Sequence, residues 1–295
     1  MNFHTDLALE RREYHKEKTL DGVKFATRSK ESIAITDVEI INEQGEAVLG
    51  KPKGKYITLE SKHLYHKTSK SDDFAKVLAE EIRRMIPEKG SVLVAGLGNE
   101  DITPDALGPK CISRVFATRH LSKELKETIG LEKLRSVCAV VPGVLGKTGI
   151  ETTEILSGTA KTAKPSCIIV VDALASRNTA RLGTTVQLCS SGIEPGSGVG
   201  NHRKAINEET FGVPVIAIGV PTVVDGATMT IDILEKSGAD IDSALEKEIS
   251  AQGKMFVTPK SIDNLIENCA HIVALAINLA LQPELTLDEI KELVG

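Results

Sequence analysis

The stretch SVLVAGLGN at residues 91–99 decides the fold class, because an uninterrupted apolar run leads directly into a glycine-containing turn. Four more short apolar runs follow along the chain: SVCAVVPG, SCIIVVDALA, TTVQLCSSG and GVPVIAIGVPTVV. Several of them are separated by stretches long enough for a helix. Apolar strands that alternate with helices are typical of a sheet buried on both faces. The sequence therefore predicts an α/β fold with a mainly parallel, twisted sheet and helices on both faces.

The remaining segments fit around this sheet. Residues 150–163 suit a crossover helix, and residues 260–281 form a nearly all-round apolar helix that we expect to be buried. Residues 21–60 contain three short strand patterns. Residues 1–20 are highly charged and show no packing pattern, which predicts a loose arm. We expect this arm to precede a single α/β domain at 21–295, with a small β subregion at its start.

Composition narrows the functional classes. The chain has 36 Lys and Arg against 41 Asp and Glu, six Phe, three Tyr and no Trp. This balance disfavours direct nucleic-acid binding, both by bulk charge and by base stacking. No apolar run approaches the roughly 20 residues that span a bilayer, so we expect no membrane contact. The five cysteines form no CxxC pair, which disfavours a structural zinc site and favours a reducing cytoplasm.

Small and polar residues follow the ends of several predicted strands. Open α/β sheets bind ligands at the carboxyl ends of their strands, so we expect these turns to line a cleft. The candidate cleft residues are Gly96, Gly98 and Asn99 after the first run, Gly143 after the second, and Gly196, Gly198 and Asn201 after the fourth.

Two carboxylates stand out among these turns. Asp105 opens a predicted helix, and Asp172 follows a strand that we expect to be fully buried. If their strands are neighbours, the two side chains converge, one pKa rises, and the pair shares a proton. One carboxyl group then activates water while the other protonates the leaving group, as in an aspartic hydrolase. The spacing equally allows Asp105 to cap a helix and Asp172 to hold a turn.

Cofactor and metal motifs are incomplete. The Gly96-x-Gly98 pair lacks the third glycine of a dinucleotide site, and Gly146-Lys147-Thr148 lacks the first glycine of a P-loop. The sequence contains neither HExxH nor GxSxG. We therefore expect neither a cofactor nor a metal.

Several long motifs together resemble the germination protease family of spore-forming Firmicutes: GKYITLES (54–61), VAGLGN (94–99), TPDALGPK (103–110), VPGVLGKTGIET (141–152), VDALASR (171–177), SGIEPGSGVGN (191–201) and GVPVIAIGVPTVVD (212–225). The resemblance implies an atypical aspartic endopeptidase whose essential aspartates correspond to Asp105 and Asp172. It also implies a fold similar to that of hydrogenase-maturation proteases, a homotetramer, and a location in the cytoplasm of the forespore or spore core. The implied substrates are small acid-soluble spore proteins, whose degradation begins during germination.

The family resemblance also implies a zymogen that trims its own N-terminus. The segment Thr5-Asp6-Leu7-Ala8-Leu9-Glu10 matches the acidic–hydrophobic–Ala pattern of the cleaved bond, which predicts cleavage between Asp6 and Leu7 and a propeptide of about residues 1–6. A pocket for the acidic residue would draw on Arg177, Arg203 and Lys204, although a solvated rim explains these cations equally well. A metal-assisted peptidase on the same loops and a non-catalytic binding module remain as alternatives.

Overall fold

The computed structural model describes residues 4–15, 19–62, 64, 69–128, 130–194, 204–239, 241–251 and 255–294. Its strands follow the apolar runs closely. They are β1 (Val23–Lys30), β2 (Ile33–Ile40), β3 (Gly54–Glu60), β4 (Val92–Gly96), β5 (Val137–Val140), β6 (Cys167–Ser176), β7 (Thr185–Cys189), β8 (Val215–Asp225) and β9 (Phe256–Val257).

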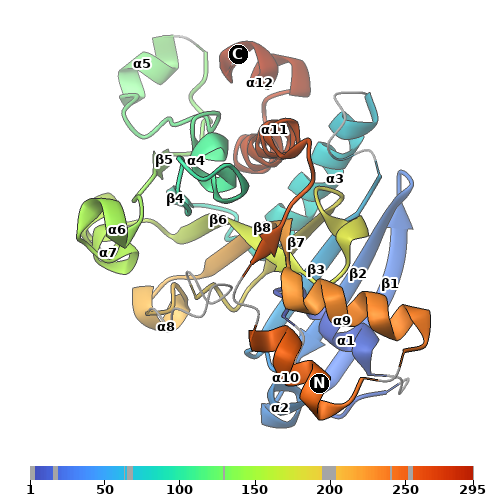
Figure 1. The fold of residues 1–295 in the computed structure, drawn as a ribbon. Helices are drawn as coiled ribbons and strands as arrows, with labels where there is room; N and C mark the ends of the chain where they lie inside the picture. The colour runs from blue at the N-terminus through green and yellow to red at the C-terminus, as the bar shows by residue number, and fades with distance from the viewer. Residues whose placement is uncertain are drawn as a thin grey trace.

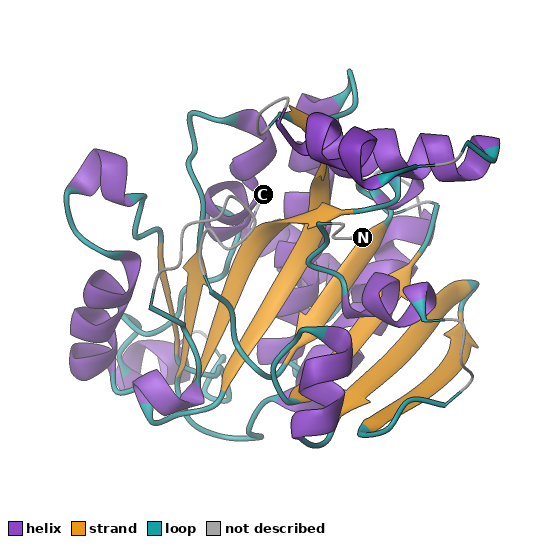
Figure 2. Cartoon of the chain, turned by 60° about the horizontal axis from the view of Figure 1, so that its bottom comes forward, coloured by secondary structure: helices purple, strands orange, loops and turns teal. Residues whose placement is uncertain are grey.

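These strands form one twisted sheet (Figure 2). Their order is β1-β2-β3-β7-β8-β6-β4-β5, and β9 pairs with the end of β8. The pairs β4–β5, β4–β6 and β6–β8 are parallel. The pairs on the other side of β8 are antiparallel. The α/β class is confirmed, and the sheet is mixed, with its parallel part restricted to β5, β4, β6 and β8.

The short connection after β6 explains the change of direction. Only residues 177–184 separate β6 from β7, and they contain a single turn of 3-10 helix, η2 (Thr179–Arg181). A parallel neighbour needs a crossover of a dozen or more residues. The chain therefore turns back, and β7 runs antiparallel beside β8.

The β region at 21–60 is continuous with the main sheet. Strands β1 and β2 form a hairpin whose turn residues Glu31 and Ser32 both have positive φ, the conformation of a tight primed turn. Strand β3 then pairs with β7 from Tyr56 opposite Cys189 to Glu60 opposite Thr185. The first strands thus extend the sheet rather than forming a separate layer.

Helices cover both faces of the sheet (Figure 1). One core contains apolar residues of α3, α4 and α11, and the other contains residues of α1, α2 and α7. The helices are α1 (Ala8–Tyr14), α2 (Glu43–Leu49), α3 (Ser69–Met85), α4 (Leu107–Ile112), α5 (Lys123–Thr128), α6 (Leu145–Thr148), α7 (Thr152–Ala163), α8 (Glu208–Phe211), α9 (Gly226–Ser237), α10 (Ser243–Ala251), α11 (Ile262–Leu281) and α12 (Leu287–Val294).

Helix α11 is the central helix of the first core. It packs against α3 and α4 and is buried along most of its length, as the all-round apolar pattern predicts. Of the helices in the described ranges, α11 is long and apolar enough to cross a membrane by length and composition. However, 78% of its most apolar window is buried inside the protein.

The N-terminal arm is docked rather than loose. Leu7 and Ala8 are fully buried, Leu9 and Glu10 are nearly so, and α1 begins at Ala8. The N–H of His4 donates to Thr228 Oγ1 of α9 at 3.0 Å. The high charge of the first 20 residues obscures this short apolar segment, which contributes to the second core through Ala8.

Candidate active site

Asp172 lies at the point where β6 extends beyond the end of its neighbour β4. The last residue pair between β4 and β6 joins Gly96 to Val171, so Asp172 is the first residue of β6 beyond the end of β4. Its Oδ1 accepts a hydrogen bond from the Ala173 N–H at 2.9 Å. The side chain therefore projects from a rigid strand at the carboxyl edge of the parallel part of the sheet.

Asp105 ends the 3-10 turn η1 (Thr103–Asp105), between β4 and α4. Its Oδ2 accepts a hydrogen bond from the Asn99 N–H at 2.7 Å. This close turn requires glycine at position 98, where φ is +107° and an added Cβ would lie 2.0 Å from the Asp105 carbonyl oxygen. Asn99 Oδ1 accepts from the Asp101 N–H at 3.2 Å, which further fixes the turn.

A second close approach brings this turn against the sheet. A Cβ on Gly96 would lie 2.3 Å from the carbonyl oxygen of Gly108 at the start of α4. The Leu97 N–H also donates to the Val171 carbonyl at 2.8 Å. Close backbone packing therefore brings the Asp105 turn to the middle of β6, at Val171 and next to Asp172.

Asp105 and Asp172 line one cleft of about 760 Å³. Burial raises the pKa of Asp172 well above its ordinary value, and the carboxylates of Asp105 and, more weakly, Asp6 raise it further, against a lowering by the Ala173 N–H. Electrostatic repulsion of this kind favours one proton shared between neighbouring carboxylates. Such a pair has the chemistry to accept a proton from water at one member and donate one from the other.

The predicted glycine turns divide into two groups. Gly98 and Gly143 line the cleft, and Gly96 and Asn99 position the Asp105 turn as described above. Gly196, Gly198, Asn201 and Arg203 lie outside the described residues.

The N-terminal arm enters the same cleft through Asp6. The Asp6 N–H donates to the Ala175 carbonyl at 2.9 Å, and the Ala175 N–H donates to Asp6 Oδ2 at 2.8 Å. Lys51 Nζ lies 4.0 Å from Asp6 Oδ1. A backbone amide and Lys51 therefore contact the acidic side chain, and neither was singled out from the sequence.

Arg177, one of the cations expected around Asp6, binds carboxylates of α9. Arg177 pairs through Nε with Asp232 at 3.0 Å and through Nη2 with Glu235 at 2.5 Å, both on α9. Lys204 is exposed. The Arg177 guanidinium therefore binds the α9 carboxylates, and the assignment of Arg177 and Lys204 to an acidic pocket stays a prediction.

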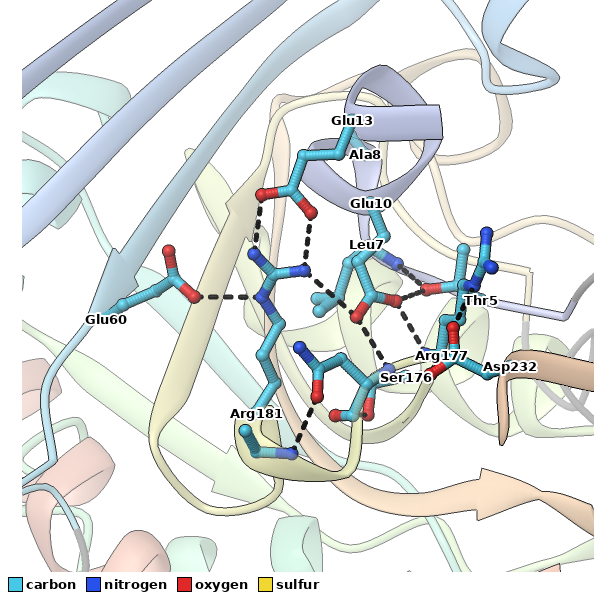
Figure 3. A network of polar contacts seen from close by, with 12 residues as sticks. Thr5, Leu7, Ala8, Glu10, Glu13, Glu60, Ser176, Arg177, Arg181 and Asp232 are labelled. Atoms are coloured by element: carbon cyan, nitrogen blue, oxygen red, sulfur yellow. Dashed lines mark hydrogen bonds and ion pairs between the residues drawn. The ribbon is translucent and has the colours of Figure 1, made fainter. Parts of the chain in front are cut away.

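Glu10 fixes the arm to the loop that follows β6 (Figure 3). Its carboxylate accepts from the N–H of Arg177 at 2.6 Å, from the N–H of Asn178 at 3.0 Å and from Arg181 Nη1 at 3.1 Å. The Thr5 hydroxyl also donates to it. Arg181 in turn pairs with Glu13 and Glu60. A nearly buried carboxylate with this many donors is a strong anchor.

Gln187 of β7 contacts the arm on both sides of Leu7. Its Nε2 donates to the Asp6 carbonyl at 3.1 Å, and its Oε1 accepts from the Ala8 N–H at 2.8 Å. The side chain is buried, with 6% of the residue exposed. The available sequence signal was a single amide within the otherwise apolar or hydroxylated strand TVQLC.

Within the ranges that the structure describes, no group of three or more His, Cys, Asp or Glu side chains is arranged to hold a metal ion. The carboxylates of the described part of the cleft therefore do not form such a metal site.

Comparisons with known proteins identify the family. The family model described as germination protease matches residues 4–241. A germination protease of Caldanaerobacter subterraneus subsp. tengcongensis is 44% identical, with 100% of this chain and 98% of that protein covered. One from Clostridium perfringens is 40% identical, covering 100% of this chain and 99% of that protein. A germination protease of Priestia megaterium is 42% identical over 85% of this chain and 70% of its own length.

A solved structure also shows a distant likeness. The [NiFe] hydrogenase maturation protease HycI from Thermococcus kodakarensis KOD1 is 15% identical, with a TM-score of 0.34, and 67% of this chain and 98% of that chain are covered. This likeness is too distant to support an argument about the cleft. The sequence relationships, in contrast, span the whole chain. The chain belongs to the germination protease family and is a peptidase.

Proposed function

We propose that this peptidase is an aspartic endopeptidase that initiates degradation of small acid-soluble, DNA-binding spore proteins during germination. In this proposal, it is made as a zymogen and trims itself between Asp6 and Leu7. The observation that carries the proposal is the convergence of Asp6, Asp105 and Asp172 on one cleft. The segment that matches the cleaved pattern thus occupies the cleft that contains the two candidate catalytic carboxylates.

In the proposed reaction, Asp105 accepts a proton from water as the water oxygen attacks the peptide carbonyl carbon. Asp172, whose raised pKa favours its protonated form, donates a proton to the leaving amine. The fixed turn at Asn99 and the rigid strand β6 hold the two groups in place, which lowers the entropic part of the barrier. A protonated and an ionised carboxyl group in one cleft supply both halves of acid–base catalysis.

The cellular setting belongs to the same proposal. The enzyme acts in the cytoplasm of the forespore and spore core as a homotetramer, without a cofactor and without binding nucleic acid directly. Its acidic balance of 36 cationic against 41 anionic side chains suits an enzyme that acts on DNA-bound proteins without binding the DNA.

The test combines substrate cleavage with metal removal. Purified full-length protein is incubated with a small acid-soluble spore protein, and the fragments are identified by mass spectrometry. We expect cleavage after an acidic residue, its loss in Asp105→Asn and in Asp172→Asn, and full activity after dialysis against a strong chelator. Activity that disappears with the chelator and returns with added metal would contradict the aspartic mechanism. A folded protein that never cuts the substrate would instead favour a binding module.

A further inference from the structure

We propose that Gln187 binds the scissile peptide on both sides and stabilises the oxyanion that forms at its carbonyl group. This inference rests on the proposed cleavage between Asp6 and Leu7. It assigns oxyanion stabilisation to a side-chain amide of β7 instead of to the glycine turns.

The position of Gln187 indicates a role outside the core. On β7, Val186 and Leu188 belong to the main hydrophobic core, so Gln187 lies on the opposite face of the sheet. It is aligned with Thr58 of β3 on one side and Gly219 of β8 on the other. Burying an amide is unfavourable unless it is hydrogen-bonded. The arm supplies partners to both ends of the Gln187 amide.

The two hydrogen bonds have the pattern of a β-strand neighbour. Gln187 donates to the carbonyl of Asp6 and accepts from the N–H of Ala8, two residues further along. A neighbouring strand makes the same pair of contacts with its own backbone. The Leu7 N–H, which becomes the leaving amine, donates to Thr5 Oγ1 at 3.1 Å. Gln187 therefore aligns the peptide backbone across the bond between Asp6 and Leu7, independently of side-chain identity.

The contact with the Asp6 carbonyl strengthens during the reaction. Water attacks the carbonyl carbon and passes one proton to a carboxylate of the dyad, the pair Asp105 and Asp172. The C=O π electrons move to the oxygen, which becomes an oxyanion that accepts from Gln187 Nε2. When the C–N bond breaks, the dyad returns a proton to the Leu7 nitrogen, leaving a carboxyl group on Asp6 and a free amine on Leu7. A hydrogen bond to a charged oxygen is stronger than one to a neutral carbonyl.

The test compares two substitutions of Gln187 with a matched control. Gln187→Met removes both hydrogen bonds at similar volume, whereas Gln187→Glu keeps the acceptor for Ala8 and loses the amide donor. Gln282 offers the control, because its buried amide also binds one backbone N–H and one carbonyl, both of Arg135, in a different part of the molecule. Gln282→Met therefore reproduces the loss of a buried amide without involving the cleft.

Each full-length variant is shifted to mildly acidic pH, which favours the proton that the two cleft carboxyl groups share. Loss of residues 1–6 is then followed by intact mass. A synthetic peptide of residues 1–14 serves as substrate in trans for kcat and KM. Removing one oxyanion donor lowers kcat roughly 100- to 1,000-fold. We expect such a drop in trimming and in kcat for both Gln187 variants, with Gln282→Met trimming at the wild-type rate and each variant folded by circular dichroism.

The outcomes separate this proposal from the one on which it rests. Wild-type protein that is cut between Asp6 and Leu7 while Gln187→Met is cut equally fast would overturn the role of Gln187 alone. Normal trimming by Gln187→Glu would overturn the oxyanion role, because the acceptor contact would then suffice. Wild-type protein that is never cut at this bond would overturn both proposals.

Discussion

Replacing Glu10 with Ala should release the N-terminal arm from the cleft. Glu10 is 3% exposed, and its carboxylate accepts hydrogen bonds from two backbone N–H groups, those of Arg177 and Asn178, at 2.6 and 3.0 Å. A truncated side chain leaves both donors without their partner as long as the arm stays in place. Arg181 is less affected, because Glu13 and Glu60 continue to bind it.

The size of the effect follows from these contacts. Hydrogen bonds to a charged group contribute about 1.5–3 kcal/mol each, so the two backbone bonds amount to about 3–6 kcal/mol. Water satisfies the donors once the arm undocks, which makes the lower bound the appropriate figure. A loss of about 3 kcal/mol raises the population of the undocked arm by roughly 100-fold or more.

Glu13→Ala provides a matched control on the same helix. Glu13 also pairs with Arg181, but its side chain is 50% exposed. An exposed ion pair contributes about 0.2–1 kcal/mol, which corresponds to less than roughly sixfold in arm opening. The two substitutions therefore remove the same carboxyl chemistry from a buried and from an exposed position.

Hydrogen–deuterium exchange of the arm measures the difference. Both substitutions are made in the Asp172→Asn background, so that the arm remains intact during the experiment. We expect the Ala8 amide, which is bonded to Gln187, to exchange at least about 100-fold faster with Glu10→Ala and nearly unchanged with Glu13→Ala. Equal protection in the two variants would refute the claim that Glu10 anchors the arm.

Three further substitutions test the cleft itself. The raised pKa of Asp172 means that the folded chain keeps a proton that the unfolded chain loses above about pH 3.9, so wild-type stability falls as pH rises through this window. Asp172→Asn should therefore gain in Tm relative to wild type between pH 4 and pH 7, and a constant Tm difference would contradict the shift. Gly98→Ala should lose at least about 1 kcal/mol of stability and most of its trimming activity, because the added Cβ meets the Asp105 carbonyl. The control Gly146→Ala adds a Cβ in open space, so melting and trimming assays should show no change in either property. Lys51→Met should slow trimming about fivefold, because it removes a partly buried cation 4.0 Å from the Asp6 carboxylate. An unchanged trimming rate would contradict a role of Lys51 in binding Asp6.

The strands were predictable because burial on both faces leaves continuous apolar runs. VLVAG at 92–96 is β4 from end to end, and the run around Ile168 is β6. Strand direction was not predictable from these runs, because it depends on the length of each connection and on partners far away in the sequence. The eight residues from 177 to 184 reverse the chain before β7, and β7 then joins the N-terminal strands to the parallel part.

The candidate site was partly predictable for a related reason. Asp105 follows β4, whereas Asp172 lies within β6 and not after it; β4 and β6 proved to be neighbours, so the convergence of the two side chains is a consequence of topology. The docked arm was missed because only Leu7, Ala8 and Leu9 interrupt a charged segment, and their burial depends on tertiary contacts. The observed partners of Arg177 were not predictable because residue type does not indicate which carboxylate a guanidinium will bind. Asp232, its partner, lies 55 positions away.

The most direct test of the whole account is the N-terminal mass of purified full-length protein after a shift to mildly acidic pH. We predict that wild-type protein loses residues 1–6 and begins at Leu7, and that Asp105→Asn and Asp172→Asn keep the intact mass while remaining folded. Trimming at the wild-type rate in either variant, or cleavage at a different bond, would contradict the claim that these two aspartates cut the chain between Asp6 and Leu7.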